Sequence, residues 1–167
     1  MQHEITAARP LLDEKGNLRE AGYCKKLLPI YRRRDIKAGA LRIKEWDYYL
    51  VNNGHFAVAL TIADNGYMGL DSISLLNLDE GWEKTKSPMR AFPLGKTGLP
   101  ESSETGDVSI SGKGYHLSFR HDGPDRVLDL HMEDFLDGAL ELCRALEVRA
   151  DTTMTSTVSI FRSFIMP

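Results

Sequence analysis

The segment EWDYY (45–49) sets two carboxylates among three large aromatic side chains. In an extended strand, alternate residues share a face, so Asp47 and Tyr49 point one way while Trp46 and Tyr48 point the other. A carboxylate that faces an apolar interior favours its protonated form and can act as a proton donor. Asp47 is therefore a candidate general acid. The alternative is an Asp47 on the outer face of the strand, opposite a core Trp46, as in ordinary half-buried strands.

Asp71 is a second candidate proton donor, because it lies in another stretch with the composition of a strand. A polar residue in such a strand either hydrogen-bonds inside or faces water. Asp64 is a further candidate, but it is more simply explained as a turn residue. The catalytic candidates of the sequence are thus Asp47 and Asp71.

Motifs for metals and cofactors are incomplete in this sequence. Gly95-Lys96-Thr97 resembles the end of a phosphate-binding loop, but Arg90 stands where that motif needs its first glycine. His116 and His121 are separated by an odd number of positions in one expected strand, so their side chains leave on opposite faces. We therefore predict no metal site and no cofactor.

Composition is typical of one soluble globular domain. The chain has 167 residues, of which 42% are hydrophobic and 27% charged. No apolar run approaches the roughly 18 residues that would span a bilayer. The N-terminal sequence has no basic end followed by an apolar stretch, so we expect no secretory signal and a cytoplasmic location. Cys24 and Cys143 have no partner spacing and are expected to be reduced thiols.

Charge is distributed unevenly along the chain. Up to Lys44 there are 11 basic and 5 acidic residues, and 11 − 5 gives +6; the remainder has 10 basic and 19 acidic residues, and 10 − 19 gives −9. A basic arm that neutralises an acidic body explains this asymmetry. The run YRRR (31–34) lacks the aromatic and glycine interleaving of a nucleic-acid site, so we predict no nucleic-acid partner.

Residues 41–76 predict three consecutive strands of an antiparallel meander. Asn52-Asn53-Gly54 and Asp64-Asn65-Gly66 supply residues that tolerate positive φ, as tight hairpin turns require. In the middle strand, bulky side chains alternate with small ones, which predicts one face turned to a core. We expect this face to form a binding site for a small apolar ligand. The residues that line the site are Trp46, Tyr48, Phe56, Val58, Leu60 and Ile62.

The other segments complete a mainly β prediction. The expected elements are an irregular arm (1–40), a loop-rich stretch (77–106) with a short strand near 89–92, strands near 107–111, 114–122 and 127–132, a short helix or loop ahead of a strand (133–148), and a terminal strand (156–165). We predict an antiparallel meander that forms a lipocalin-like (calycin) barrel or half-barrel over residues 41–167, with the arm packing on its sheet.

The words EWDYY, ALTIADNGYMGLDSISLL and FPLGKTGLPESSETGDVSI resemble a bacterial family of uncharacterised proteins known as domain of unknown function 2804. The match runs from LLDEKGNLRE to about Asp134. The resemblance implies a calycin-like architecture of two lipocalin-type β-halves, distantly similar to carotenoid hydratases. The chain looks like the N-terminal half alone, which implies exposed sheet edges and self-association, or pairing with a C-terminal half.

Three functions remain open from the sequence. The first is a lipocalin-like module that binds a small apolar molecule such as a lipid or an isoprenoid. The second is a hydratase or isomerase in which Asp47 or Asp71 protonates an alkene. The third is a structural half-domain that needs a partner half.

Overall fold

The structure is a computed structural model that describes residues 2–102, 105–123, 125–135, 142–148 and 157–165, the last two ranges as backbone. Contacts divide the chain into two units, Met1–Gly39 and Ala40–Pro167. The first unit is largely irregular. Its regular elements are the parallel two-residue strands β1 (Arg9–Pro10) and β2 (Pro29–Ile30) and the 3-10 helix η1 (Arg33–Asp35).

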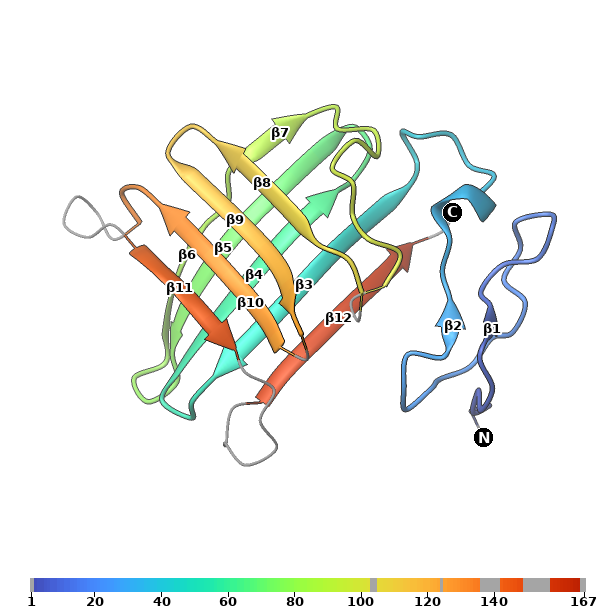
Figure 1. Cartoon of the computed structure of the whole chain (residues 1–167), viewed down its shortest axis with the longest axis horizontal. Coiled ribbons are helices and arrows are strands. Elements are labelled where there is room, and N and C mark those ends of the chain that lie inside the picture. Colours follow the sequence, from blue (N-terminus) through green and yellow to red (C-terminus); the bar gives the residue numbers. More distant parts are fainter. Residues whose placement is uncertain (1, 103–104, 124, 136–141, 149–156, 166–167) are drawn as a thin grey trace. The chain divides into compact units, whose positions relative to one another are not determined.

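The second unit consists of two antiparallel sheets that face each other (Figure 1). The six-stranded sheet has the order β12-β3-β4-β5-β6, and β7 also pairs with β5. Its strands are β3 (Lys44–Asn52), β4 (Phe56–Asp64), β5 (Met68–Asn77), β6 (Trp82–Lys86), β7 (Met89–Ala91) and β12 (Thr157–Ile165). The four-stranded sheet has the order β11-β10-β9-β8, with β8 (Val108–Gly112), β9 (Tyr115–Asp122), β10 (Asp125–Met132) and β11 (Leu142–Val148). The mainly β, antiparallel prediction is confirmed, and neither sheet closes into a barrel over the described strands.

The two predicted hairpin turns join β3 to β4 and β4 to β5. Gly54 and Gly66 both have positive φ, of 89° and 76°. A Cβ atom on Gly66 would also lie 2.5 Å from the carbonyl oxygen of Ala40. Glycine is therefore required at the second turn for two reasons, its backbone conformation and the close approach of a neighbouring chain segment.

Two segments differ from the sequence-based expectation. In the stretch expected to be mostly loop, β7 confirms the short strand, but the charged strand β6 was missed. Edge strands commonly carry such charges, which hide the alternation of a strand. The short helix or loop expected over 133–148 is wrong for 142–148, where β11 pairs with β10 from Met132↔Leu142 to Arg126↔Val148. Pairing with a neighbouring strand overrides the helical spacing of its apolar residues; residues 136–141 lie outside the described part.

The core fills the space between the two sheets. Tyr49 of β3 and Phe119 of β9 meet edge to face, with ring centroids 4.7 Å apart. The buried apolar cluster comprises Tyr49, Leu60, Ile62, Ile73, Val108, Tyr115, Leu117, Phe119, Leu128, Leu130, Met132 and Phe135. Removing this surface from water is the main force that holds the two sheets together.

The register of β3 against β4 decides which face of β3 is inside. Asp47 pairs with Ile62 and Tyr49 with Leu60, so Asp47 faces the core and is 1% exposed. The outer-face alternative for Asp47 is therefore wrong. Trp46 and Tyr48 lie on the opposite face of the sheet, and the prediction that they line the interior is also wrong.

Candidate functional site

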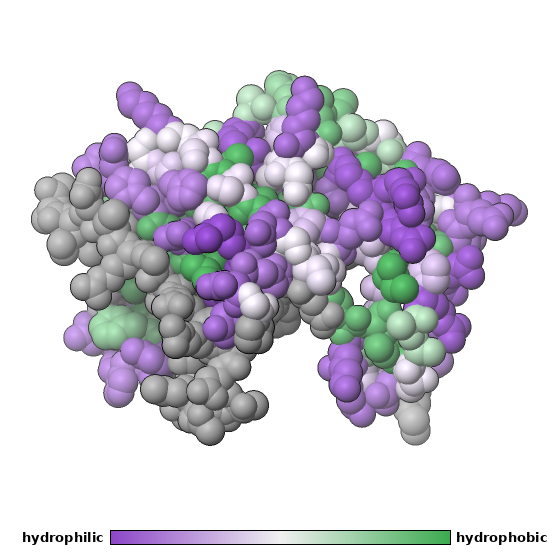
Figure 2. Space-filling model, in the orientation of Figure 1, coloured by the Kyte–Doolittle hydropathy of each residue, from purple (hydrophilic) through white to green (hydrophobic). Residues whose placement is uncertain are grey.

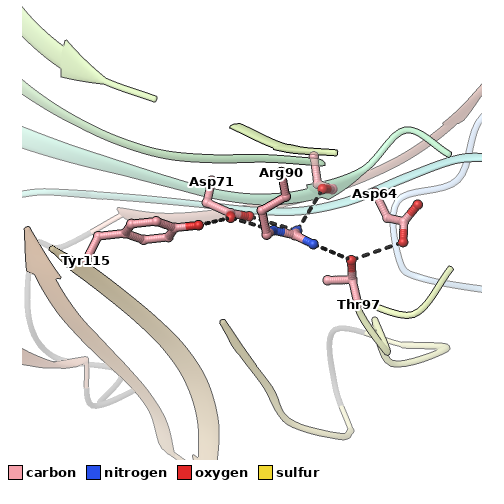
Figure 3. A network of polar contacts seen from close by, with 6 residues as sticks. Asp64, Asp71, Arg90, Thr97 and Tyr115 are labelled. Carbon is pink, nitrogen blue, oxygen red and sulfur yellow. Dashed lines mark hydrogen bonds and ion pairs between the residues drawn. The ribbon is translucent and has the colours of Figure 1, made fainter. Parts of the chain in front are cut away.

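A buried polar network lies between the two sheets, centred on Asp71 of β5 (Figure 3). Arg90 of β7 grips this carboxylate with two parallel bonds: its Nε donates to Oδ2 at 2.7 Å and its Nη2 to Oδ1 at 3.0 Å. Tyr115 of β9 donates its hydroxyl hydrogen to Oδ2 at 2.8 Å. A bidentate arginine–carboxylate pair is among the strongest polar contacts in proteins, and here a tyrosine from the facing sheet joins it.

The network continues from Arg90 to the loop that follows β7. Thr97 Oγ1 accepts a hydrogen bond from Arg90 Nη1 at 3.1 Å and donates one to Asp64 Oδ2 at 3.0 Å. The backbone N–H of Gly95 also donates to Asp64 Oδ2, at 2.7 Å. The Ala63 carbonyl oxygen accepts from Arg90 Nη2 at 3.2 Å, so all three guanidinium nitrogens of Arg90 have partners.

Backbone bonds hold this loop in place beside the β4–β5 turn. Phe92 N–H donates to the Tyr67 carbonyl at 3.0 Å, and Leu94 N–H donates to the Gly66 carbonyl at 3.1 Å. Phe92 and Leu94 have positive φ values of 49° and 53°, which are unusual for bulky residues. The side chain of Phe92 is exposed. Figure 2 shows apolar side chains gathered at the top of the view, where Figure 1 draws β7. In this conformation Gly95 N–H and Thr97 Oγ1 of the loop reach Asp64.

Gly69 makes room for the guanidinium group of Arg90. The two residues are register partners on β5 and β7. A Cβ atom on Gly69 would lie 2.8 Å from Arg90 Cζ, closer than side-chain atoms approach. The guanidinium group of Arg90 thus packs directly against the backbone of Gly69. Sequence reasoning missed that Gly69 leaves this space.

Burial raises the pKa of Tyr115 to about 12, and its hydrogen bond to Asp71 acts in the same direction. The hydrogen bonds to Asp71 also raise the pKa of Arg90. Asp71 accepts three hydrogen bonds from these two residues. Because both oxygens of Asp71 accept these bonds, the arrangement suits a structural carboxylate; a role as proton donor stays a prediction.

The structure places the two predicted catalytic residues on the same face of one sheet but not in contact. Ile62 of β4 lies between them, as the register partner of both Asp47 and Asp71. Asp47 is almost completely buried, and Arg162 of β12 is its register partner on the other side. Asp47 therefore remains the candidate acid that faces the apolar core.

An apolar strip on the core-facing side of the six-stranded sheet becomes more exposed towards the β3–β4 turn. Tyr49, Leu60 and Ile73 are register partners, and each is fully buried. The next core-facing row is half-buried and packs against the core; it consists of Val51, Val58 and Leu75, which we call the apolar row.

Beyond the apolar row lie Phe56 and Trp82, with ring centroids 6.5 Å apart. Phe56 is 43% exposed and Trp82 40% exposed. Of the residues predicted to line a ligand, Phe56, Val58, Leu60 and Ile62 lie on this face, and only the last two are fully buried. The core thus has one end at which its apolar surface meets solvent.

Among the residues whose side chains the structure describes, Arg126 of β10 is a second arginine that enters the core. The residue is 8% exposed, and its Cζ atom lies 5.3 Å from the centroid of the Tyr49 ring. Its Nη1 donates to the Gly106 carbonyl at 2.9 Å and contacts the His121 ring. The other two nitrogens, Nε and Nη2, are buried without a hydrogen-bond partner among the described residues.

Sequence reasoning also missed Arg126. The alternation of Leu128, Leu130 and Met132 marks the core-facing side of β10, and one more step back along the strand reaches Arg126. An arginine in register with a buried apolar face is the signal that could have identified it.

Two other kinds of site are absent from the part of the chain that the structure describes. No cluster of three or more His, Cys, Asp or Glu residues there is placed to hold a metal ion. No helix there is long and apolar enough to cross a membrane.

Comparison with known proteins identifies the family but not a relative of known activity. The model of the family described as Domain of unknown function (DUF2804) matches residues 2–164. Searches of curated proteins and of solved structures gave no significant match. The chain therefore belongs to the DUF2804 family.

Proposed function

We propose that the β unit binds a small apolar molecule, such as a lipid or an isoprenoid, on the core-facing side of its six-stranded sheet. The observation that supports this proposal is the graded exposure of that face. It runs from the buried Tyr49 through the half-buried apolar row to the exposed rings of Phe56 and Trp82.

The composition of this apolar strip resembles that of a ligand-binding site. Binding sites for small molecules are mostly apolar and contain a few polar groups that fix the orientation of the ligand. An apolar chain laid along Val51, Val58 and Leu75 would extend the core and remove their exposed surface from water. Each 100 Å² of apolar surface buried contributes about 2.5 kcal/mol before the cost of association.

In this proposal the ligand lies in a lipocalin-like position between two antiparallel sheets, which face each other across one core but do not close into a barrel over the described strands. In this proposal the ligand enters at the end of the core where Phe56 and Trp82 lie. The buried network around Asp71 then holds the two sheets together, since Tyr115 and Asp71 come from different sheets.

The test is a titration with the neutral apolar fluorophore N-phenyl-1-naphthylamine, which brightens in apolar surroundings. We expect saturable uptake at one probe per chain. Val51→Trp should fill the site and abolish uptake, whereas Leu50→Trp, on the outer face of the same strand, should leave it unchanged. Uptake that does not saturate, or that both variants affect equally, contradicts the proposal; self-association without uptake would favour a structural half-domain.

The burial of Asp47 on the core-facing side supports a second candidate, a hydratase. In that reaction the Asp47 carboxyl group protonates one carbon of an alkene, water adds to the other carbon, and the proton released from that water restores Asp47. Incubation with oleate or squalene in H₂¹⁸O should give a hydroxylated product that carries ¹⁸O. Asp47→Asn should abolish this product while probe uptake persists; an unchanged product yield removes the assignment.

A further inference from the structure

We infer that Arg126 recognises a carboxylate, so that the ligand of this site is an apolar carboxylic acid of the fatty-acid type. This inference rests on the proposed function, because it names the polar end of the same ligand. Its basis is a pair of buried donors on Arg126 that the described protein does not satisfy.

Arg90, which also enters the core, shows what this pair of donors can bind. In Arg90, Nε and Nη2 form the side of the guanidinium group that holds both oxygens of Asp71, at 2.7 and 3.0 Å. In Arg126 the same two atoms, Nε and Nη2, are the ones without a partner among the described residues. A planar fork with this spacing matches the two oxygens of a carboxylate.

Arg126 is buried, so water cannot replace the hydrogen-bond partners that its Nε and Nη2 lack among the described residues. Its side chain is 10% exposed. Its polar contacts among the described residues are the Gly106 carbonyl at 2.9 Å, the His121 ring and the Asp107 carboxylate at 3.9 Å, all through Nη1. Asp107 is 56% exposed, so water screens its charge. A buried cation with two unsatisfied donors is destabilising unless an anion reaches it.

The position of Arg126 fits the polarity of a fatty acid. The guanidinium group lies over the ring of Tyr49, and Tyr49 belongs to the row beside Val51, Val58 and Leu75. A carboxylate bound at Arg126 would therefore place the start of an alkyl chain next to the apolar row. The charged end of the ligand would then contact Arg126, and its alkyl chain would contact the apolar row.

The test compares laurate with dodecanol, which has the same alkyl chain without the charge. Both ligands displace bound N-phenyl-1-naphthylamine from the full chain, and we expect laurate to bind the wild type at least about tenfold more tightly than dodecanol. Arg126→Met should weaken laurate binding by about 10- to 100-fold and leave dodecanol unchanged, because hydrogen bonds to charged groups have this magnitude.

Two further variants control the experiment. Arg120→Met removes an exposed arginine of β9 that pairs with Asp129, and it should change neither affinity. Arg126→Lys keeps the charge but loses the fork, so its laurate affinity should fall between those of the wild type and Arg126→Met; it also replaces Arg126→Met if that variant does not fold.

Equal affinities of laurate and dodecanol for the wild type would overturn the inference, as would a laurate preference that survives in both Arg126 variants. In either case saturable probe uptake would leave the proposed function standing. A wild type that takes up no probe at all overturns the proposed function, and the inference with it.

Discussion

Arg90 and Arg126 enter the same core from facing sheets, and they differ in the hydrogen-bond acceptors that surround them. Every nitrogen of Arg90 has a partner, and the carboxylate it holds is its own chain's Asp71. Arg126 uses Nη1 alone among the described residues. The comparison shows that burial by itself does not give an arginine its role. An arginine whose donors are all satisfied by protein acceptors forms a structural ion pair. An arginine with buried donors that lack acceptors is a candidate ligand site.

The largest expected effect comes from making the same substitution at both positions. Arg90→Met leaves the carboxylate of Asp71 buried and without its cation, so the free energy of unfolding should fall by about 3–5 kcal/mol. Arg126→Met removes a buried charge with few partners, and its cost should be less than about 1 kcal/mol or even a gain. Urea denaturation monitored by circular dichroism measures both. Equal losses in the two variants would contradict the distinction between the arginines.

Gly69→Ala should break the Arg90 network by a steric route. The new methyl group would lie 2.8 Å from Arg90 Cζ, and overpacking of this kind costs about 1–3 kcal/mol. Gly39→Ala is the matched control, because a Cβ atom there meets nothing within 4 Å. The loss of stability caused by Gly69→Ala should be smaller in an Arg90→Met background, because the two residues are in contact and their effects are coupled. A loss of the same size in both backgrounds would mean that the contact with Arg90 is not its cause.

Alkaline pH should weaken the network through Tyr115. Its pKa is raised to about 12 in the folded protein, above the value near 10 of an unfolded chain. The folded state therefore holds this proton more tightly. The stabilisation is fully present below pH 10 and is lost as the pH rises through 12, with a total of about 3 kcal/mol. Urea midpoints between pH 9 and 12 should decline more steeply for the wild type than for Tyr115→Phe; parallel curves would refute this assignment.

The smallest effect is expected at the solvent-exposed end of the apolar strip. Phe56 is 43% exposed, so Phe56→Ala should cost less than about 1.5 kcal/mol, whereas Leu60→Ala, fully buried on the same strand, should cost about 2–5 kcal/mol. Phe56→Ala should nevertheless weaken probe uptake severalfold. A variant that loses stability as severely as Leu60→Ala would show that Phe56 belongs to the packed core rather than to a ligand entrance.

The sequence predicted the strands of both sheets better than it predicted their faces. Alternation in EWDYY groups Asp47 with Tyr49 and Trp46 with Tyr48, but it does not say which group is inside. The register against Leu60 and Ile62 decides that question, and register depends on the whole sheet. The turns at Gly54 and Gly66 were predictable because their signals are local.

The candidate site was harder to predict, because its residues are far apart in the chain. Asp71 was identified from the sequence, but its partners Arg90 and Tyr115 follow it by 19 and 44 residues. Arg90 also lies in a stretch with the composition of a loop. Only the folded arrangement of β5, β7 and β9 brings these three side chains together.

The most direct test of the central claim is a ¹⁵N–¹H spectrum of the arginine side chains recorded while laurate is added. If Arg126 holds the ligand carboxylate and Arg90 is occupied by Asp71, the Nε–H signal of Arg126 should move downfield and saturate with laurate, and that of Arg90 should stay in place. An Arg126 signal that does not respond, or an Arg90 signal that moves in its stead, would contradict the account.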